Sequence, residues 1–351
     1  MNDTTLAHGL RERLATYQRP HLGRSLLEIA WTALPLAALW IAAHLAVSNG
    51  LWWGTALTPV AAMFLVRLFM IQHDCGHAAF FRSRQANEWT GRAIGVLTMT
   101  PYDYWRRTHA IHHATSGNLD RRTLGGVETL TVDEYRAKSR LERFGYRLYR
   151  NPLVMFGLGP GYMFVLQHRL PVGLMRERGA WLSVMGNSLG LVLLIVLQLL
   201  LGGWHGLVMV HLPIVVMASA VGVWLFYVQH QFEGAYWVRN KGWSAEAAAL
   251  HGSSHLDLPA PLRWLTANIG VHHVHHVGCK IPFYRLPEVL RDIPDLKPVS
   301  RITLADVPGT VRLALWDEVR GRLVSFREER RERKAQIMHP PQHAPLEPAG
   351  A

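Results

Sequence analysis

Charged residues are absent from two long stretches of the chain, and this pattern predicts membrane-spanning helices. No Asp, Glu, Lys or Arg occurs from Ile29 through Val66, or from Gly179 through Phe232. Each stretch is long enough for two passes, because a helix needs about 20 mostly apolar residues to cross a bilayer. We therefore predict an integral membrane protein with four spanning helices.

A turn signal divides each stretch into two helices. Ser48-Asn49-Gly50 interrupts the first stretch, and Gly202-Gly203-Trp204-His205-Gly206 interrupts the second. Trp residues at both turns suit the aromatic belt at a membrane surface. The predicted spans cover about residues 27–48, 52–72, 181–201 and 207–229.

The distribution of arginine predicts the orientation of these helices. Neither turn carries a charge, whereas the polar segments outside the spans are rich in Arg. The positive-inside rule then places both termini on the cytoplasmic side. We expect a single all-α domain over residues 1–335, with two transmembrane hairpins under a cytoplasmic helical cap of residues 73–180 and 230–335. Residues 132–150 look like an amphipathic surface helix, and residues 336–351 like a disordered Pro/Ala tail.

The net charge of +12 does not point to nucleic acid. The basic residues border the apolar stretches, and no nucleic-acid-binding motif accompanies them. Attraction to an anionic membrane leaflet explains them better. The chain has two cysteines, which indicates no disulfide framework. We also expect no cleaved signal peptide.

Three histidine clusters are the candidate chemistry: His73-x-x-x-His77, His109-x-x-His112-His113, and His272-His273-x-His275-His276. Residues at i, i+3 and i+4 share one face of a helix, so each cluster aims its rings at one point. His273 does not fit the i, i+3, i+4 spacing of His272, His275 and His276. We interpret the isolated histidines as structural residues: His8, His21, His44, His168, His205, His211, His339 and His343.

Eight converging rings are more than one metal ion can bind, so we predict two ions. Imidazole suits Fe, Cu and Zn. Soluble di-iron proteins use Glu together with Glu-x-x-His, and no Glu-x-x-His occurs here. If the metal is iron, a shell of neutral rings leaves a more positive centre, able to reduce oxygen and attack an unactivated C–H bond. A site just outside the bilayer favours an acyl chain as substrate.

Longer motifs surround these clusters: His-Asp-Cys-Gly-His at 73–77, Tyr-Trp-Arg-Arg-Thr-His-Ala-Ile-His-His-Ala-Thr at 104–115, Asn-Leu-Asp-Arg at 118–121, and Ile-Pro-Phe-Tyr at 281–284. Over about residues 25–325 the chain resembles the membrane fatty acid desaturase family, and closely its bacterial Δ12/ω-6 acyl desaturases. The resemblance implies a bacterial inner-membrane enzyme with two irons. It also implies that oxygen serves to insert a cis double bond into an already monounsaturated chain.

The resemblance also assigns residues. It places metal ligands at His73, His77, His109, His112, His113, His272, His275 and His276. Related enzymes add a histidine just after the fourth span, where this chain has His230, with His251 and His255 as alternatives. We expect five further residues to orient ligand rings from outside, the alternative being helix capping or surface charge. These are Asp74, Asn118, Asp120, His255 and Asp257.

The chain lacks the His-Pro-Gly-Gly haem segment of cytochrome b5. We therefore expect electrons from a separate ferredoxin-like or cytochrome donor, whose acidic surface the Arg-rich cap could receive. Lipid headgroups would compete for the same charges. The acyl group could be carried on lipid, CoA or a carrier protein.

Rival functions remain open at this point. A hydroxylase, acetylenase, conjugase or carotenoid oxygenase would share the scaffold. An intramembrane zinc protease would need His-Glu-x-x-His, which is absent. A membrane metal transporter would place polar or ionisable residues at the bilayer midplane, but before His230 the two uncharged stretches hold only His44, His205 and His211 among their histidines, and the clusters lie outside them.

Overall fold

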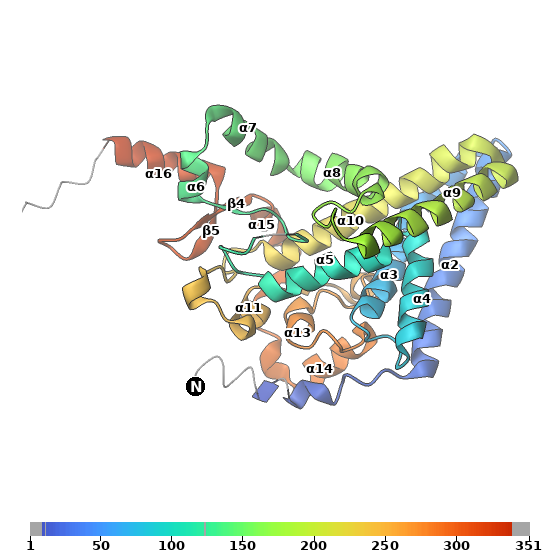
Figure 1. Cartoon of the computed structure of the whole chain (residues 1–351), viewed down its shortest axis with the longest axis horizontal. Coiled ribbons are helices and arrows are strands. Elements are labelled where there is room, and N and C mark those ends of the chain that lie inside the picture. Colours follow the sequence, from blue (N-terminus) through green and yellow to red (C-terminus); the bar gives the residue numbers. More distant parts are fainter. Residues whose placement is uncertain (1–8, 11, 123, 339–351) are drawn as a thin grey trace, which may run out of the picture.

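The computed structural model describes residues 9–10, 12–122 and 124–338 (Figure 1). Each of the four predicted spans coincides with a helix that is long and apolar enough to cross a membrane. These helices are Leu22–Ser48, Trp52–Gly76, Arg178–Leu201 and Gly203–His230. They meet pairwise at the upper right of Figure 1.

Local sequence explains where the long helices turn. Helix α2 (Leu22–Ser48) is followed by η1 (Trp52–Leu57) and α3 (Thr58–Gly76), which has Pro59 in its first turn. Helix α9 (Arg178–Gly206) leads into η5 (Leu207–His211) and α10 (Leu212–His230). Gly203 has φ +66°, which favours glycine, and this residue breaks the helix. Helix α3 packs against α2, α10 and α4 (Arg84–Leu97).

Shorter helices build the rest of the molecule around the end of α3. Helix α5 (Tyr102–Thr115) packs beside α9, and α11 (Ala245–His251) beside α13 (His272–Val277). The others are α6 (Val132–Ala137), α7 (Arg140–Tyr149), η2 (Val154–Leu158), α8 (Gly159–Gly161), η3 (Tyr162–Leu166), η4 (Gln167–Arg169), η6 (Asn240–Gly242), α12 (Ala260–Leu265), η7 (Phe283–Arg285), α14 (Leu286–Asp292), η8 (Pro294–Leu296), α15 (Val307–Thr310) and α16 (Phe326–Met338).

The amphipathic segment predicted over residues 132–150 is two helices, α6 and α7. Lys138 has an extended backbone and ends the first. Ser139 and Glu142 form a capping box that begins the second. The predicted tail of residues 336–351 also begins inside a helix, because residues 336–338 belong to α16. Residues 339–351 lie outside the described residues.

The prediction of an all-α fold is wrong in one respect, because two small sheets are present. Strands β1 (Leu130–Thr131), β4 (Leu313–Asp317) and β5 (Arg322–Ser325) form one sheet, in the order β1-β4-β5. Strands β2 (His255–Asp257) and β3 (Arg301–Thr303) form the other, in parallel. Such short strands show little hydrophobic alternation, and most of these pairings join distant segments, so a local pattern does not reveal them.

A buried ion pair joins the two charges that bound the first uncharged stretch. Arg67 of α3 and Glu28 of α2 are each 1% exposed, and they pair directly. Arg67 also donates to Thr32 Oγ1 at 3.2 Å, and its guanidinium lies 4.1 Å from the ring centroid of Trp264. The pair therefore links the first hairpin to α12.

Replacing Glu28 by Gln should destabilise the protein strongly. The change leaves the buried Arg67 cation without its carboxylate, which typically costs about 3–5 kcal/mol. We expect a large fall in the thermal unfolding midpoint in detergent. The double variant Glu28→Gln/Arg67→Met should recover part of the loss. Glu288→Gln, in a pair with Arg285 that is 38% exposed at Glu288, should change the midpoint little; an equal effect would contradict a special role for the buried pair.

Candidate metal centre

Four helices carry the predicted ligand residues to one place. Helix α3 holds His73 in its last turn and His77 at its C-cap, because the helix continues past the predicted end at residue 72 as far as Gly76. Helix α5 carries His109, His112 and His113, and the short helix α13 carries His272, His275 and His276. His230 is the last residue of α10.

Five rings form the first group: His73, His77, His109, His113 and His275, whose nitrogens lie within 4.8 Å of one another. His109 is at its centre. Its Nε2 lies 3.1 Å from the Nε2 atoms of His73, His77 and His113. The Nε2 of His275 lies 3.2 Å from that of His113.

The second group contains His112, His230 and His276, with His272 beside them. The Nε2 atoms of His112 and His230 are 3.1 Å apart. The Nε2 of His272 lies 3.0 Å from that of His230 and 3.1 Å from that of His276. The two groups adjoin, because the rings of His113 and His276 stack with centroids 4.1 Å apart. All nine predicted ligands therefore converge.

Hydrogen bonding alone does not explain this arrangement. A neutral imidazole has a single N–H, yet His109 Nε2 faces three other Nε2 atoms at the same distance. Nitrogens bound at right angles to one ion would lie about 3 Å apart, given metal–nitrogen bonds of roughly 2.1 Å. The observed spacing fits two metal ions that share this donor set.

The environment keeps the rings neutral, as metal ligands must be. Burial, and after it repulsion from neighbouring rings, lowers the pKa of the imidazoles outside the spans well below the usual range. These are His77, His109, His112, His113, His272, His275 and His276. At neutral pH their lone pairs are available to a metal.

Sequence comparisons bear on the centre directly. A family model described as fatty acid desaturase matches residues 50–304, a range that contains all nine rings. The chain is 42% identical to a fatty acid desaturase of Bacillus subtilis over 330 residues, which cover 93% of this chain and 94% of the relative. This chain belongs to the fatty acid desaturase family.

Two cyanobacterial desaturases are more distant relatives. The chain is 26% identical to an sn-1 oleoyl-lipid 12-desaturase of Synechocystis over 268 residues, 74% of this chain and 68% of the relative. It is 27% identical to an sn-1 acyl-lipid omega-3 desaturase (ferredoxin) of Synechocystis over 228 residues, 62% and 61% of the two chains. The predicted membership in the fatty acid desaturase family is thus confirmed, and it implies an oxidoreductase. Membership and the four apolar helices both fit an integral membrane protein.

The histidines and acids proposed around this desaturase's centre differ in their contacts. His273, left over by the spacing, points its Nε2 to the carbonyl of Leu296 at 2.9 Å. His255 faces the carbonyl of Lys297 at 2.8 Å, and Asp257 pairs with Arg301. None of these three, nor His251, is in either ring group.

Of the three other outer residues, Asp74 lies within hydrogen-bonding distance of a predicted ligand ring. Its Oδ1 lies 3.3 Å from His73 Nδ1, and its Oδ2 accepts from the Phe283 amide at 2.7 Å. Asp120 instead accepts from Arg239 and from the Asn240 amide, so it ties surface loops together. Asn118 caps its own turn and donates to Asn240. Both side chains bond to residues 239–240, so their role is to hold two surface loops together.

Replacing Asp74 by Asn should weaken metal binding. The variant removes a charge beside His73 and one of two acceptor oxygens, and loss of such a partner typically costs roughly 10–100-fold in metal affinity or activity. Metal affinity measured by competition with a chelator would show it. Asp120→Asn is the matched control and should bind metal like the parent. Equal affinity in both variants would show that Asp74 does not position His73.

Several residues that position the rings cannot be identified from the spacing of the histidines. The carbonyl of Gly252 lies 3.1 Å from His230 Nδ1, which leaves Nε2 free to face the other rings. Trp105 stacks on His109, with centroids 4.7 Å apart. Phe226 packs against His112 and His230 at 5.0 and 5.1 Å. Trp105 and Phe226 lie four residues before His109 and His230, so a helical reading would place each beside a ligand.

A large cavity of about 920 Å³ opens onto the second ring group. His112 and His230 line its inner end with Phe226. Leu124, Val127 and Leu130 give it apolar walls, whereas its mouth holds charged residues. These are Arg121, Arg122, Glu128, Glu134, Lys138 and Glu142. The cavity thus connects buried rings to the surface of the desaturase.

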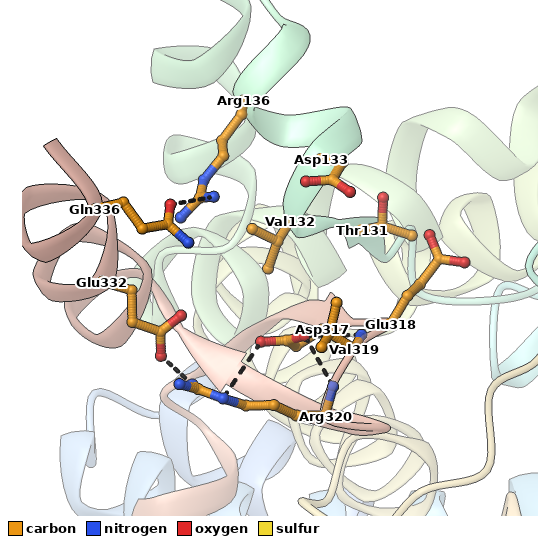
Figure 2. A pocket seen from close by; sticks show the side chains of 10 residues that line it. All are labelled: Thr131, Val132, Asp133, Arg136, Asp317, Glu318, Val319, Arg320, Glu332 and Gln336. Carbon is orange, nitrogen blue, oxygen red and sulfur yellow. Dashed lines mark hydrogen bonds and ion pairs between the residues drawn. The ribbon is translucent and has the colours of Figure 1, made fainter. Parts of the chain in front are cut away.

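A smaller cavity, of about 230 Å³, lies away from the rings between α6, the β4–β5 turn and α16 (Figure 2). Arg320 within it pairs with Asp317 and Glu332. No histidine lines this cavity, and Arg136 and Glu318 in its lining pair with Glu329 and Arg239 outside it. It is therefore separate from the metal centre.

Proposed function

We propose that this desaturase uses two irons, bound by the nine converging histidines, to insert a double bond into a fatty acyl chain. The observation that carries the proposal is the cavity that leads to His112 and His230. Irons held there would supply the oxygen-activating chemistry. Two C–H hydrogens, two donor electrons and two protons would reduce one O2 to two waters.

The chain's own residues would have three tasks in this reaction. The rings hold the metal, and Asp74 and the Gly252 carbonyl fix the orientation of His73 and His230. Phe226, Leu124 and Val127 offer an apolar surface to a hydrocarbon and exclude water from it. The cavity volume is ample for an acyl chain, since each methylene occupies only about 30 Å³, the volume of a water molecule.

We place the new double bond at the Δ12/ω-6 position of a monounsaturated chain. The motifs that resemble bacterial desaturases of this type support the assignment, as does the similarity to the Synechocystis sn-1 oleoyl-lipid 12-desaturase. The Bacillus subtilis relative is named only as a fatty acid desaturase.

We further propose that electrons come from a separate, acidic protein. One relative is named as a ferredoxin desaturase. On this chain α16 presents Arg327, Arg330 and Arg331, whose guanidinium groups form no ion pair within the described residues. Such cations would favour an acidic partner and make its binding sensitive to salt.

Fatty-acid profiling of a bacterial host that expresses the gene would test this function. A host that contains oleate but no diunsaturated chains should acquire a cis-Δ12 product, only in air. A hydroxylated or acetylenic product would overturn desaturation in favour of a related oxygenation. If the expressed protein contains two irons per chain and a reduced donor is supplied, an unchanged fatty-acid profile would overturn acyl chemistry altogether.

We propose that both termini and the metal centre face the cytoplasm of a bacterial inner membrane. Reporter tags at Gly50 and Gly203, in the two uncharged turns, should then read as periplasmic. Tags at Glu134 and at the C-terminus should read as cytoplasmic, because Arg-rich segments stay on that side. A periplasmic signal at Glu134 would contradict this topology.

A further inference from the structure

His230 depends on support from outside its own helix. It is the last residue of α10, and Gln231 after it has left the helical conformation, with φ −119° and ψ 73°. The last turn of a helix frays easily, because its carbonyls have no partner further along the helix. A metal site needs its rings held to within about 0.5 Å. Whatever fixes the end of α10 therefore also fixes the second ring group.

The segment that follows α11 gives part of this support. Ser254 donates from its amide to the Gln229 carbonyl at 2.9 Å, and from its hydroxyl to the Val228 carbonyl at 3.1 Å. The carbonyl of Gly252 lies 3.1 Å from His230 Nδ1. These contacts satisfy two carbonyls of the last turn and set the rotation of the ring. They do not hold the side chains on either side of His230.

A buried arginine holds those side chains. Arg150 lies at the C-cap of α7 and is 6% exposed. Its Nη2 donates to Gln231 Oε1 at 2.9 Å and to the Tyr227 hydroxyl at 3.3 Å, and its guanidinium lies 5.3 Å from the Tyr227 ring centroid. Tyr227 and Gln231 are four residues apart, so they lie on the same side of the helix end. Arg150 therefore grips α10 three residues before His230 and one residue after it.

The same guanidinium anchors this grip to two other segments. Its Nη1 donates to the Glu128 carbonyl at 3.0 Å, and its Nη2 to the carbonyl of Leu313, the first residue of β4, at 2.8 Å. Arginine suits this task because its guanidinium carries five N–H donors in a fixed planar fork, whereas a lysine ammonium is a compact point charge. Segments that lie far apart in the sequence are thus tied to the end of α10.

The acceptors of Arg150 are all neutral oxygens, whereas the buried Arg67 pairs with Glu28. Burying a cation among neutral groups is costly, and the Nε of Arg150 has no hydrogen-bond partner in the described part of the chain. An apolar side chain could fill such a space at lower cost. The cost is explained if the protein needs the hydrogen-bonding fork itself at this place.

We propose that Arg150 is a positioning residue of the metal centre, which acts through Tyr227 and Gln231 to hold His230 among the rings of the second group. The inference rests on the proposed function, because the position of His230 matters only if the rings hold metal. Gln231 also lines the large cavity beside His230, so the same contact keeps this part of the cavity wall in place.

Removal of cobalt(II) by a chelator would test this role without turnover. The full-length protein is purified from cells grown with cobalt(II), whose visible absorption depends on the geometry of its ligands, and the chelator is added in steps. The parent should release two ions. In Arg150→Gln we expect one ion to be bound roughly 10–100-fold more weakly, the loss typical when a partner that orients a ligand is removed, and its absorption to change. The other ion should behave as in the parent.

Arg169→Gln serves as the control. Arg169 also donates to neutral oxygens, Asn187 Oδ1 at 3.0 Å and the Met99 carbonyl at 2.6 Å, and its Nε likewise has no partner within the described residues. Its bond to Asn187 joins η4 to α9, which carries none of the predicted ligands. The variant should lose stability but bind both cobalt ions like the parent.

A double variant identifies the affected ion. His276 belongs to the second group, so Arg150→Gln/His276→Ala should bind cobalt no more weakly than His276→Ala alone. Parent-like binding and absorption in Arg150→Gln would overturn the proposal, and so would an equal loss in Arg169→Gln, because Arg150 would then act only on stability.

A milder variant covers the case in which Arg150→Gln does not fold. Gln231→Leu removes the strongest contact between Arg150 and α10 but leaves the arginine bonded to the carbonyls of Glu128 and Leu313. It should show the same selective weakening of one ion, and parent-like cobalt binding would contradict the proposal. A parent that binds two cobalt ions in this way, yet in its iron form desaturates no acyl chain, would refute the proposed function alone.

Discussion

Replacing His109 by alanine is expected to abolish turnover and to lower bound metal to about one ion per chain. Its Nε2 lies 3.1 Å from three other ring nitrogens, more than any other ring of the first group. Its loss leaves His73, His77 and His113 without their common neighbour, and imidazole ligands are needed to hold such an ion. Iron per chain, measured by elemental analysis of the purified variant, would show the loss.

His273→Ala is the matched control for this variant. It removes a buried histidine of the third cluster, whose Nε2 faces the Leu296 carbonyl rather than another ring. We expect it to keep parent-like iron and to lose at most some stability. His276→Ala should behave like His109→Ala. Full iron and full turnover in both His109→Ala and His276→Ala would mean that the rings are not ligands, provided that all variants elute as folded protein in detergent.

His230→Ala should be as damaging as a change in any of the three clusters. His230 stands alone in the sequence, yet its Nε2 is 3.1 Å from that of His112 and 3.0 Å from that of His272. It is thus the bridge between α5 and α13 in the second group. We expect turnover below detection and reduced iron, both measured against the parent at equal amounts of folded protein.

His211→Ala serves as the comparison because His211 is also buried and lies just before α10, whose last residue is His230. Its Nδ1 faces the amide of Gln198 at 3.2 Å, and it has no ring of either group beside it. Most activity should therefore remain. Equal tolerance of the two substitutions would make His230 a structural histidine and leave the centre with eight rings.

The sequence alone determined the membrane-length helices and the helix faces that carry the histidines, because both follow from local patterns. The two uncharged stretches predicted four helices of spanning length, and each is present. The spacing within the three clusters predicted that rings of one helix share a face, because the helical repeat is set by backbone geometry alone. The ends of helices were less certain. Helix α3 runs beyond its predicted end to Gly76, whereas α9 is broken at Gly203, inside the turn predicted at residues 202–206.

Tertiary structure decided which distant residues meet. No local pattern links Gly252 to His230, and its carbonyl reaches the His230 ring because α10 and α11 end at the same place. Asp74 and Asp120 both look like partners of a metal ligand, yet only the backbone path directs Asp74 to His73 and Asp120 to Arg239. The parallel pairings of β1 with β4 and of β2 with β3 also join segments that lie far apart in the sequence. Contacts between distant segments depend on how helices pack, and that depends on the whole set of side chains rather than on any local pattern.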